Sequence, residues 1–280
     1  MLQINDETIA NYANYLQEME KSKATVRKYV RSICRFCNCC GGNIKSKAVI
    51  LEYKETLHKQ GYSISTINGN IAAINSFLSF AGIPEWKLRS LRIQKRNFQI
   101  DDNEITFDEY RRMIETSEKI SDKRMPYILM TLASTGIRIS ELPYITPQGL
   151  RRGRIQISLK GKIRIILIPE SLSKTLLIYC EKNKIIEGSI FISRNGRPLH
   201  RSYIWRKFKE IAIKAGIDQN KIYPHNFRHF FARTYYDAYS DVIHLADILG
   251  HSSVNTTRIY TMRRGAEERD KIEALGLAVI

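Results

Sequence analysis

The 280-residue sequence lacks several features that mark common protein classes. No apolar run reaches the roughly 18 residues that a membrane-spanning helix requires. The first ten residues, MLQINDETIA, include acidic residues and no basic segment, so we expect no secretory signal and a cytoplasmic location. The sequence also has no acidic cluster of the kind that Mg²⁺-dependent nucleases use and no G-x-x-x-x-G-K-[S/T] phosphate-binding loop. We therefore expect no metal and no nucleotide cofactor.

Cysteine is scarce outside one short segment. Four of the five cysteines are Cys34, Cys37, Cys39 and Cys40. A structural zinc site needs four convergent ligands. The segment reads as one helix that ends at a Gly-Gly pair, and on such a helix three of the thiols share a face while Cys39 points away. One helix cannot close a tetrahedral site in this way, so we favour free thiols in a reducing compartment over a zinc site.

Acidic residues are few relative to basic ones. The chain has 45 Lys and Arg against 28 Asp and Glu, which gives a net charge of +17 and a pI near 9.7. Residues 1–100 carry 15 basic and 7 acidic residues, and residues 101–280 carry 30 and 21, so both parts are basic. A basic excess over whole domains is typical of nucleic-acid binders. A basic protein without such a partner stays open on charge alone, and an anionic membrane surface is the weaker option, since no segment reads as a basic amphipathic anchor.

The apolar residues of the first part recur at helical spacing in four segments between residues 5 and 83. We expect these helices to follow Asn5 or Asp6, Ser22, Ser46 and Ser65. We therefore assign residues 1–87 to a small all-helical domain. On its second helix Arg27, Arg31 and Arg35 recur every four residues and share one face. This stripe either follows DNA phosphates or is a solvated face, and the sequence leaves both interpretations open.

The second part mixes helices with a short sheet. Residues 88–104 are polar, basic and aperiodic, so we predict a linker in which Lys95 and Arg96 cross a DNA backbone. Thr106 and Glu109 form a capping-box pattern that opens a new helix. Two β-branched runs, RIQISL and IRIILI, flank Lys160-Gly161-Lys162 and predict a hairpin. We predict a mainly α fold with a small antiparallel β-sheet, in which residues 105–280 form a mixed α+β domain.

Four fragments of the second part carry a recognisable combination. They are TGIRISEL (135–142), SLKGKIRIILIP (158–169), PHNFRHFFART (224–234) and LGHSSVNTTRIYT (249–261). The set resembles the tyrosine recombinases, also called phage-type or λ-type integrases. The resemblance covers residues 105–275 and, more loosely, the helical first domain, which looks like the core-binding domain of that family. It implies a site-specific recombinase of the compact Xer-like or mobile-element form, since the chain begins almost at once with the first-domain helices.

The resemblance assigns two arginines and a nucleophile. Arg138 and Arg228 match the family's catalytic arginines, and the guanidinium fork suits the non-bridging oxygens of a phosphodiester. Tyr260, nine residues after His251, matches the nucleophile. A phenol with a pKa near 10 needs help to attack at neutral pH, and neighbouring cations favour its phenolate. Three nearby tyrosines are better explained by packing: Tyr235, Tyr236 and Tyr239.

The remaining catalytic residues also follow from the resemblance. His225 and His251 match two imidazoles that bond the scissile phosphate and manage protons. Lys160, at the predicted hairpin tip, matches a lysine that protonates the departing 5′ oxygen, although Lys162 lies close by. We expect His229 to pack beside this site. Glu141 either orients its own helix or forms a simple ion pair.

The expected reaction is covalent strand exchange without metal or ATP. By resemblance, a 3′-phosphotyrosyl bond forms on Tyr260, and two sequential exchanges pass through a Holliday junction. Four protomers would hold two duplexes with paired inverted half-sites, and the segment after Tyr260 would pack on a neighbouring subunit. Accessory DNA-bending or directionality proteins are partners that the sequence leaves open.

Two other functions compete with this interpretation. A type IB topoisomerase shares the tyrosine, arginine and lysine chemistry, but the tail beyond Tyr260 and the compact first domain favour a recombinase. A non-catalytic DNA-binding accessory protein that kept the fold is expected to have lost a catalytic residue, and none is lost here.

Overall fold

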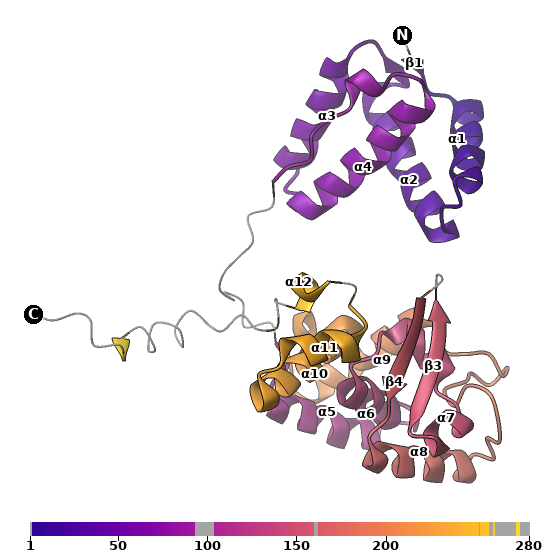
Figure 1. The fold of residues 1–280 in the computed structure, drawn as a ribbon, viewed down its shortest axis with the longest axis vertical. Coiled ribbons are helices and arrows are strands. Elements are labelled where there is room, and N and C mark those ends of the chain that lie inside the picture. The colour runs from indigo at the N-terminus through magenta and orange to yellow at the C-terminus, as the bar shows by residue number, and fades with distance from the viewer. Residues whose placement is uncertain are drawn as a thin grey trace, which may run out of the picture. The chain divides into compact units, whose positions relative to one another are not determined.

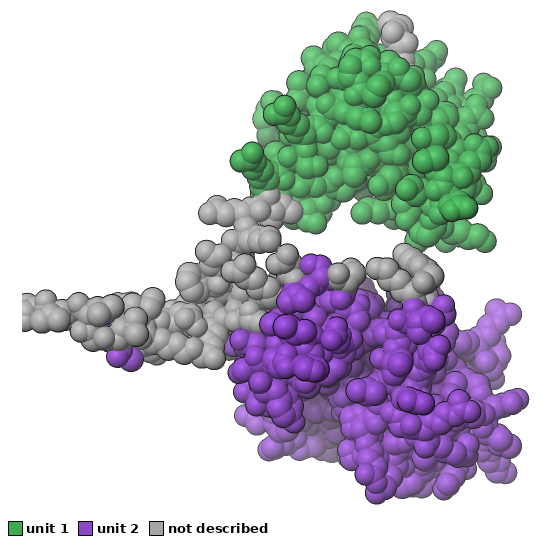
Figure 2. All heavy atoms as spheres, in the orientation of Figure 1, with its two compact units in different colours: residues 1–96 green, residues 97–280 purple. Residues whose placement is uncertain are grey.

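The computed structural model describes residues 2–92, 104–159, 162–251, 253–257, 260 and 273–274. Internal contacts divide the chain into two compact units, residues 1–96 and residues 97–280 (Figure 2). Each unit buries its own hydrophobic core.

Four helices build the first unit (Figure 1). Its elements are β1 (Leu2–Gln3), α1 (Asp6–Glu18), α2 (Lys23–Cys40), β2 (Asn43–Ile44), α3 (Lys47–Lys59), α4 (Ile64–Phe80) and the 3₁₀ turn η1 (Pro84–Trp86). The apolar stripes of α2 and α4 meet in the core, where Ile33, Phe36 and Phe77 are fully buried. β1 and β2 form a short antiparallel pair that the sequence did not predict.

Side-chain caps mark where three of these helices begin. Asn5 Oδ1 accepts a hydrogen bond from the Thr8 amide, and the Ser22 hydroxyl accepts one from the Thr25 amide at the start of α2. α3 begins directly after Ser46, whose side chain makes no capping bond. These three predicted starts are confirmed. The fourth was wrong by two residues, because the hydroxyl that accepts the Thr66 amide belongs to Ser63, which places Ser65 inside the first turn of α4.

Two asparagines of α4 hold the chain that follows η1. The Asn75 side chain accepts from the Leu88 amide and donates to the Leu88 carbonyl, both at 2.9 Å. Asn68 makes the same pair of bonds to Leu91, at 2.8 and 2.9 Å. Residues 88–92, at the start of the segment that we predicted to be a linker, are therefore bound to the first unit.

A nearly buried helix lies at the centre of the second unit (Figure 1). This helix, α6 (Met125–Thr135), packs against α5 (Phe107–Lys119), α8 (Glu170–Lys182), α9 (Arg201–Lys214) and α10 (Pro224–Tyr239). The other elements are η2 (Ile139–Tyr144), α7 (Pro147–Arg151), β3 (Arg154–Leu159), β4 (Lys162–Leu167), η3 (Gln219–Lys221), α11 (Val242–Leu249) and α12 (Val254–Thr257). Thr106 and Glu109 form the predicted capping box at the start of α5.

The predicted hairpin is confirmed. β3 and β4 pair antiparallel, with Ile155 opposite Ile166 and Ile157 opposite Arg164. The two isoleucines of β3 and Ile166 are buried, so this face of the sheet turns toward the core and brings Arg164 with it. The outer face is exposed, and residues 160 and 161 lie outside the described part of the chain.

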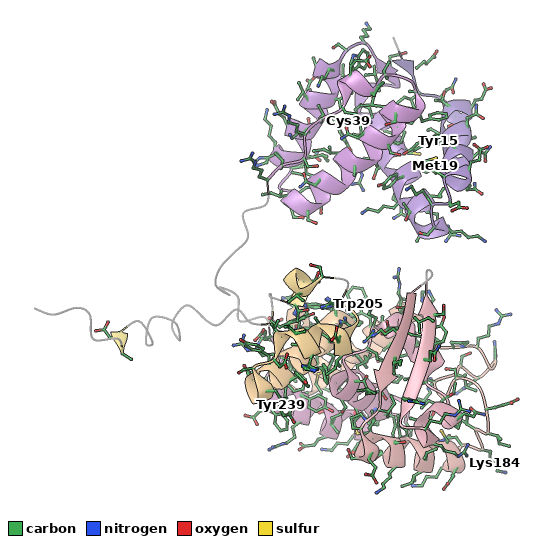
Figure 3. All side chains as sticks on the ribbon, in the orientation of Figure 1. Tyr15, Met19, Cys39, Lys184, Trp205 and Tyr239 are labelled. Carbon is green, nitrogen blue, oxygen red and sulfur yellow. The ribbon has the colours of Figure 1, made fainter. Side chains whose placement is uncertain are left out.

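The mainly α fold with a small antiparallel sheet is confirmed. Within the described residues, no helix is long and apolar enough to cross a membrane. No three His, Cys, Asp or Glu side chains of that part gather closely enough to hold a metal ion. All five cysteines are free thiols, and the Cys37 thiol donates to the Ile4 carbonyl, whereas Cys39 is exposed on α2 (Figure 3).

Candidate active site

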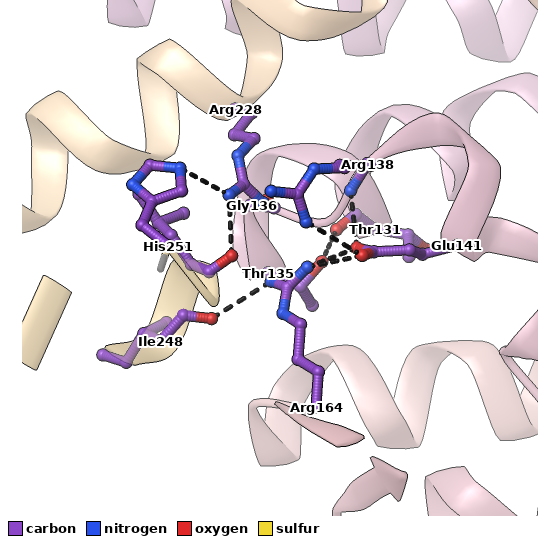
Figure 4. Close-up of polar contacts among 10 residues, drawn as sticks. Thr131, Thr135, Gly136, Arg138, Glu141, Arg164, Arg228, Ile248 and His251 are labelled. Atoms are coloured by element: carbon purple, nitrogen blue, oxygen red, sulfur yellow. Dashed lines mark hydrogen bonds and ion pairs between the residues drawn. The ribbon is translucent and has the colours of Figure 1, made fainter. Parts of the chain in front are cut away.

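Three segments that are far apart in sequence meet at one end of α6 (Figure 4). They are the turn from Gly136 to Glu141, the first half of α10, and the turn that follows α11. Arg164 on β4 contributes a fourth side chain, and its guanidinium reaches both the Gly136–Glu141 turn and the end of α11. The fold therefore gathers the quoted motifs around a cluster of guanidinium groups.

Arg228 lies at the centre of this cluster and is only 1% exposed. Its Nη1 donates to the Gly136 carbonyl and its Nη2 to the Leu249 carbonyl, both at 2.7 Å. Its Nη2 also lies 2.8 Å from His251 Nε2. Burial, together with the neighbouring Arg138 and Arg164, lowers the pKa of Arg228 to about 10, so the group is still charged at neutral pH. Its Nε is buried and has no partner within the described residues.

Two glycines make room for these contacts. Gly136 ends α6 with a φ of 59°, and a Cβ there would lie 2.4 Å from the ring of Phe231. Gly250 ends α11 with a φ of 64°, and a Cβ there would lie 2.7 Å from Cδ of Arg164. Both positions combine a left-handed backbone with a close approach, so only glycine fits without displacing a neighbour. The T-G and L-G pairs of the motifs are explained by this geometry.

The buried carboxylate of Glu141 organises the other two arginines. It accepts from the backbone amide of Arg138 at 2.8 Å and from its Nη1 at 3.2 Å. It also accepts from Nη1 of Arg164, at 2.5 and 2.7 Å to its two oxygens. Glu141 therefore does both things that the sequence left open: it caps its own 3₁₀ turn and pairs with cations. The side chain of Arg138 stays 42% exposed, so its guanidinium can meet a ligand.

His251 is held in one tautomer. Because a guanidinium only donates, Nε2 of His251 must accept from Arg228, and Nδ1 therefore carries the proton. Nδ1 lies 2.8 Å from the Thr257 hydroxyl, which accepts that proton's hydrogen bond. Burial and the charge of Arg228 lower the pKa of His251 to about 4, so the ring is neutral at pH 7.

Tyr260 lies against this cluster and is 2% exposed. Its ring centroid is 6.1 Å from that of His251 and 4.9 Å from that of His229. Burial raises the pKa of Tyr260 above its usual value, while the charge of Arg228 and a hydrogen bond with Arg228 act in the opposite direction. The phenol is therefore protonated at neutral pH and must lose its proton when it attacks.

His225 and His229 lie one turn apart on α10, with ring centroids 4.9 Å apart. Burial and the charge of Arg228 lower the pKa of His225, although part of its ring reaches solvent. Burial, and then His225, lower the pKa of His229 to about 4. His229 thus packs between His225 and Tyr260.

The charges of the cluster do not balance. The guanidiniums of Arg138, Arg164 and Arg228 face one carboxylate, that of Glu141, among the described residues. The imidazoles are neutral, so the cluster holds two positive charges in excess. Buried charge is costly unless it is paired, and an arrangement of this kind favours a bound anion.

Sequence reasoning missed Arg164 and Thr257. Arg164 has a signal that could have found it: it alternates in register with Ile166 and Ile168, which face the core, so a charged side chain at that position needs an internal partner. Thr257 had no signal beyond lying on the turn between His251 and Tyr260. The predicted leaving-group acid, Lys160, lies outside the described residues, as do Lys95 and Arg96.

The predicted arginine stripe lies on the exposed face of α2 in the first unit. Arg31 and Arg35 line a hollow of about 290 Å³ between α2 and α4, together with Lys28, Ser32, Ser65, Thr66, Gly69 and Asn70. The Arg35 guanidinium lies 5.8 Å from the ring centroid of Tyr62. Arg27 is exposed but does not line this hollow.

Comparison with protein families decides the class. The model of the phage integrase family matches residues 103–267, which is more than half of the chain. The chain belongs to the phage integrase family. The model of the phage integrase N-terminal SAM-like domain matches residues 9–82. The family resemblance that the four motifs indicated is confirmed, and the chain is a tyrosine site-specific recombinase.

Individual relatives agree with this assignment. Tyrosine recombinase XerA of Pyrococcus furiosus is 28% identical over 285 residues, which cover 98% of this chain and 96% of that protein. The structure of the XerH site-specific recombinase bound to palindromic difH, a post-cleavage complex, has a TM-score of 0.67 and 21% identity, and covers 90% of this recombinase and 79% of XerH. The structure of a lambda integrase tetramer bound to a Holliday junction has a TM-score of 0.70 and 16% identity, with 91% and 76% covered. At these identities the two structures establish the fold.

Proposed function

We propose that this recombinase cuts DNA with Tyr260 and rejoins it by reversing the same step. The phenolic oxygen attacks the scissile phosphorus, an O–P bond forms to Tyr260, and the bond from phosphorus to the 5′ oxygen breaks. The product is a 3′-phosphotyrosyl link and a free 5′ hydroxyl. A 5′ hydroxyl of the partner strand then attacks the link, which restores the phosphodiester without ATP. The observation that carries this proposal is the position of Tyr260, whose buried ring lies against His229 and His251 beside Arg228, in a cluster that has excess positive charge.

The arginines supply the electrostatic part of the reaction. Negative charge grows on the non-bridging oxygens in the transition state, and preorganised donors that are held away from water stabilise it strongly. The buried, unpartnered Nε of Arg228 is such a donor, and the guanidinium of Arg138, which Glu141 holds in place, is open to the ligand. Arg164 does not need to touch the phosphate, because it holds Glu141 and therefore Arg138 in place.

The reaction needs one group that accepts the phenolic proton and a separate group that protonates the departing 5′ oxygen. From the family resemblance we assign the phenolic proton to His225, which is neutral at pH 7 and makes no hydrogen bond within the described residues, although the ring of His229 lies between it and Tyr260. His251 has both nitrogens engaged, so its role in this proposal is to hold Arg228 in place. Lys160 protonates the departing 5′ oxygen in this proposal.

The proposed substrate is duplex DNA with paired inverted half-sites. The net charge of +17 suits a polyanion, and the related XerH structure holds palindromic difH. Four protomers would hold two duplexes, as in the lambda integrase tetramer on its Holliday junction. In the first unit we assign backbone contacts to Arg31 and Arg35 in the α2–α4 hollow and, beside it, to Arg27. Lys95 and Arg96 would contact the backbone between the units, and the free thiols suit action in the cytoplasm.

Tyr260→Phe tests the nucleophile. A duplex that carries inverted repeats of about 11 base pairs, taken from the DNA flanking the gene, serves as substrate, because half-site symmetry mirrors protein symmetry. The wild type should form an SDS-resistant adduct, and the variant should bind equally well and form none. Tyr235→Phe on α10 is the matched control and should form the adduct at the wild-type level. An undiminished adduct with Tyr260→Phe would remove this residue from the mechanism.

A second assay separates strand exchange from simple relaxation. Plasmids with two sites should yield recombinant joints. Relaxation of supercoils without joints would support the topoisomerase alternative, and binding without an adduct would support the accessory protein.

A further inference from the structure

A second polar hollow, of about 630 Å³, lies in the second unit. None of the residues that line it belongs to the candidate active site. Its walls come from the turn before α6, the chain between α8 and α9, and the first turns of α9. The groups that matter for its chemistry are Ser121, Asp122, Arg124, Arg194, Tyr203 and Lys207.

A fixed network forms the floor of this hollow. Asp122 accepts from Nε and Nη2 of Arg124, both at 2.7 Å, and from the Tyr203 hydroxyl at 2.7 Å. The Asp122 side chain is 9% exposed. Burial works to raise the pKa of Asp122, but the bonds from Arg124 and Tyr203 outweigh it and hold that pKa below its usual value. Among the described residues, Asp122 is the only carboxylate that lines the hollow. It is therefore ionised and matched by Arg124, so it does not repel an anion strongly.

A rigid hairpin forms one rim. Ile192 and Pro198 make an antiparallel bridge, and the Ser193 amide donates to the Arg197 carbonyl at 2.7 Å. Gly196 has a φ of 70°, which lets the tip turn tightly. Nη1 of Arg124 donates to the Ile192 carbonyl at 2.6 Å and so fastens the hairpin to the floor. The short tip is thus held in place at both of its ends.

The rim carries cations that are not paired with acidic side chains of the described residues. Arg194, Arg197 and Arg201 are exposed, and none of them forms an ion pair within the described residues. Lys207, in contrast, is paired with Glu210 at 2.6 Å. Arg194 lines the hollow directly, beside the hydroxyls of Ser121 and Ser193.

We propose that this hollow is a second anion site that holds a backbone phosphate of duplex DNA, apart from the phosphate that is cut. The inference rests on the proposed function for the identity of the polymer. Guanidinium, ammonium and hydroxyl donors are the groups that proteins direct at DNA phosphates, and they carry no base specificity. The fixed floor and hairpin hold the backbone of Arg194 in place, so binding has to order only its side chain. The site contributes to affinity and register, and takes no part in the chemistry at Tyr260.

Arg194→Gln in the full-length protein tests the site. Binding to a 30-base-pair duplex of arbitrary sequence is measured by fluorescence anisotropy over a range of salt concentrations. Loss of one phosphate contact should reduce the slope of log affinity against log salt by about 0.9 and weaken binding about eightfold near 0.1 M salt. Arg194→Lys keeps the charge and should retain the slope. Lys184→Gln removes an equal exposed charge just after α8 (Figure 3) and should change neither quantity.

Three outcomes would overturn the proposal. An unchanged slope for Arg194→Gln overturns it, and so does an equal loss with Lys184→Gln, which would reflect overall charge. Thermal stabilisation of the wild type by pyrophosphate that Arg194→Gln abolishes, with an unchanged DNA slope, would assign the hollow to small phosphates and also overturn it.

Arg194→Gln should form the Tyr260 adduct at the wild-type rate on saturating site DNA. Absence of the adduct in the wild type would instead refute the proposed function and leave the binding result standing.

Discussion

Both units gather arginines, but they treat the guanidinium group in opposite ways. Arg228 in the second unit is 1% exposed, and its Nη1 and Nη2 groups donate to two carbonyls and an imidazole. Arg31 and Arg35 of the first unit are exposed around an open hollow. Burial lowers the pKa of Arg228 to about 10, which shows that its charge is held at a cost in free energy. Fixed buried cations suit a reacting phosphate, whereas exposed ones supply affinity for a polyanion.

The largest expected effect comes from Glu141→Gln, which removes the one carboxylate that pairs with the arginine cluster in the described part of the chain. Arg164 then remains buried and unpaired, and breaking such a pair costs about 3–5 kcal/mol. The free energy of unfolding, measured by urea denaturation, should fall by this order. Glu170→Gln removes a solvent-exposed carboxylate on α8 and should leave the urea midpoint unchanged. Equal midpoints for wild type and Glu141→Gln would contradict the balancing role.

Arg228→Lys tests whether charge alone suffices at the buried position. A lysine keeps the charge, but it cannot bond Gly136, Leu249 and His251 from one planar fork. Loss of one preorganised donor typically costs about 10²–10³ in rate, and we expect adduct formation on saturating DNA to slow by this factor. Arg31→Lys is the matched change in the first unit and should leave this rate unchanged. A wild-type rate for Arg228→Lys would show that geometry is unimportant there.

The sequence predicted a structural feature correctly where the interactions that produce it are local. Asn5 and Ser22 cap helices through bonds that span three residues, so their roles were readable from spacing. Ser63 and Ser65 stand two residues apart before the same apolar pattern, and only backbone geometry separates them. The binding of Leu88 by Asn75 depends on a distant surface of α4 and left no local signal.

The site shows the same limit. The motifs named five side chains that the structure brings together, and their catalytic roles remain predictions. Arg164 joins Glu141 across 23 residues, and the Thr257 hydroxyl accepts from Nδ1 of His251, whose tautomer is set by Arg228. Both partners lie inside the quoted fragments, but their spelling assigned them no role, because what selects them is the shape of the folded cluster.

His251 should make the stability of the catalytic unit sensitive to acid. Its pKa is about 4 in the folded protein and about 6.5 when unfolded. Between these values the unfolded chain binds more protons than the folded one. The contribution of neutral His251 to the free energy of unfolding is therefore fully present above about pH 6.5 and is lost as the pH drops toward about 4. His251→Gln should flatten this dependence of the melting temperature, and His58→Gln, on the exposed end of α3, should not. The same slope for His251→Gln and wild type would contradict the assignment.

The first-unit hollow should respond in affinity only. Arg31→Gln removes one exposed cation, and we expect about eightfold weaker binding to duplex DNA near 0.1 M salt, with a salt slope lower by about 0.9. The adduct rate on saturating site DNA should not change. Lys59→Gln at the end of α3 removes an equal charge outside the hollow and serves as the control. A slower adduct rate for Arg31→Gln at saturation would erase the distinction between the two units.

The smallest expected effect tests an ion pair of intermediate burial. Lys221 in η3 lies 3.1 Å from Glu109 of α5, with side chains 19% and 14% exposed, and its carbonyl accepts from Asn226 at the start of α10. A double-mutant cycle with Glu109→Gln and Lys221→Met removes the separate capping role of Glu109 and should leave a coupling of about 1 kcal/mol. The pair of Lys174 and Glu170 on α8, whose side chains are 72% and 82% exposed, should couple negligibly. Equal coupling in both pairs would mean that burial does not set the strength of charge pairing here, and the contrast between Arg228 and the exposed stripe would need another cause.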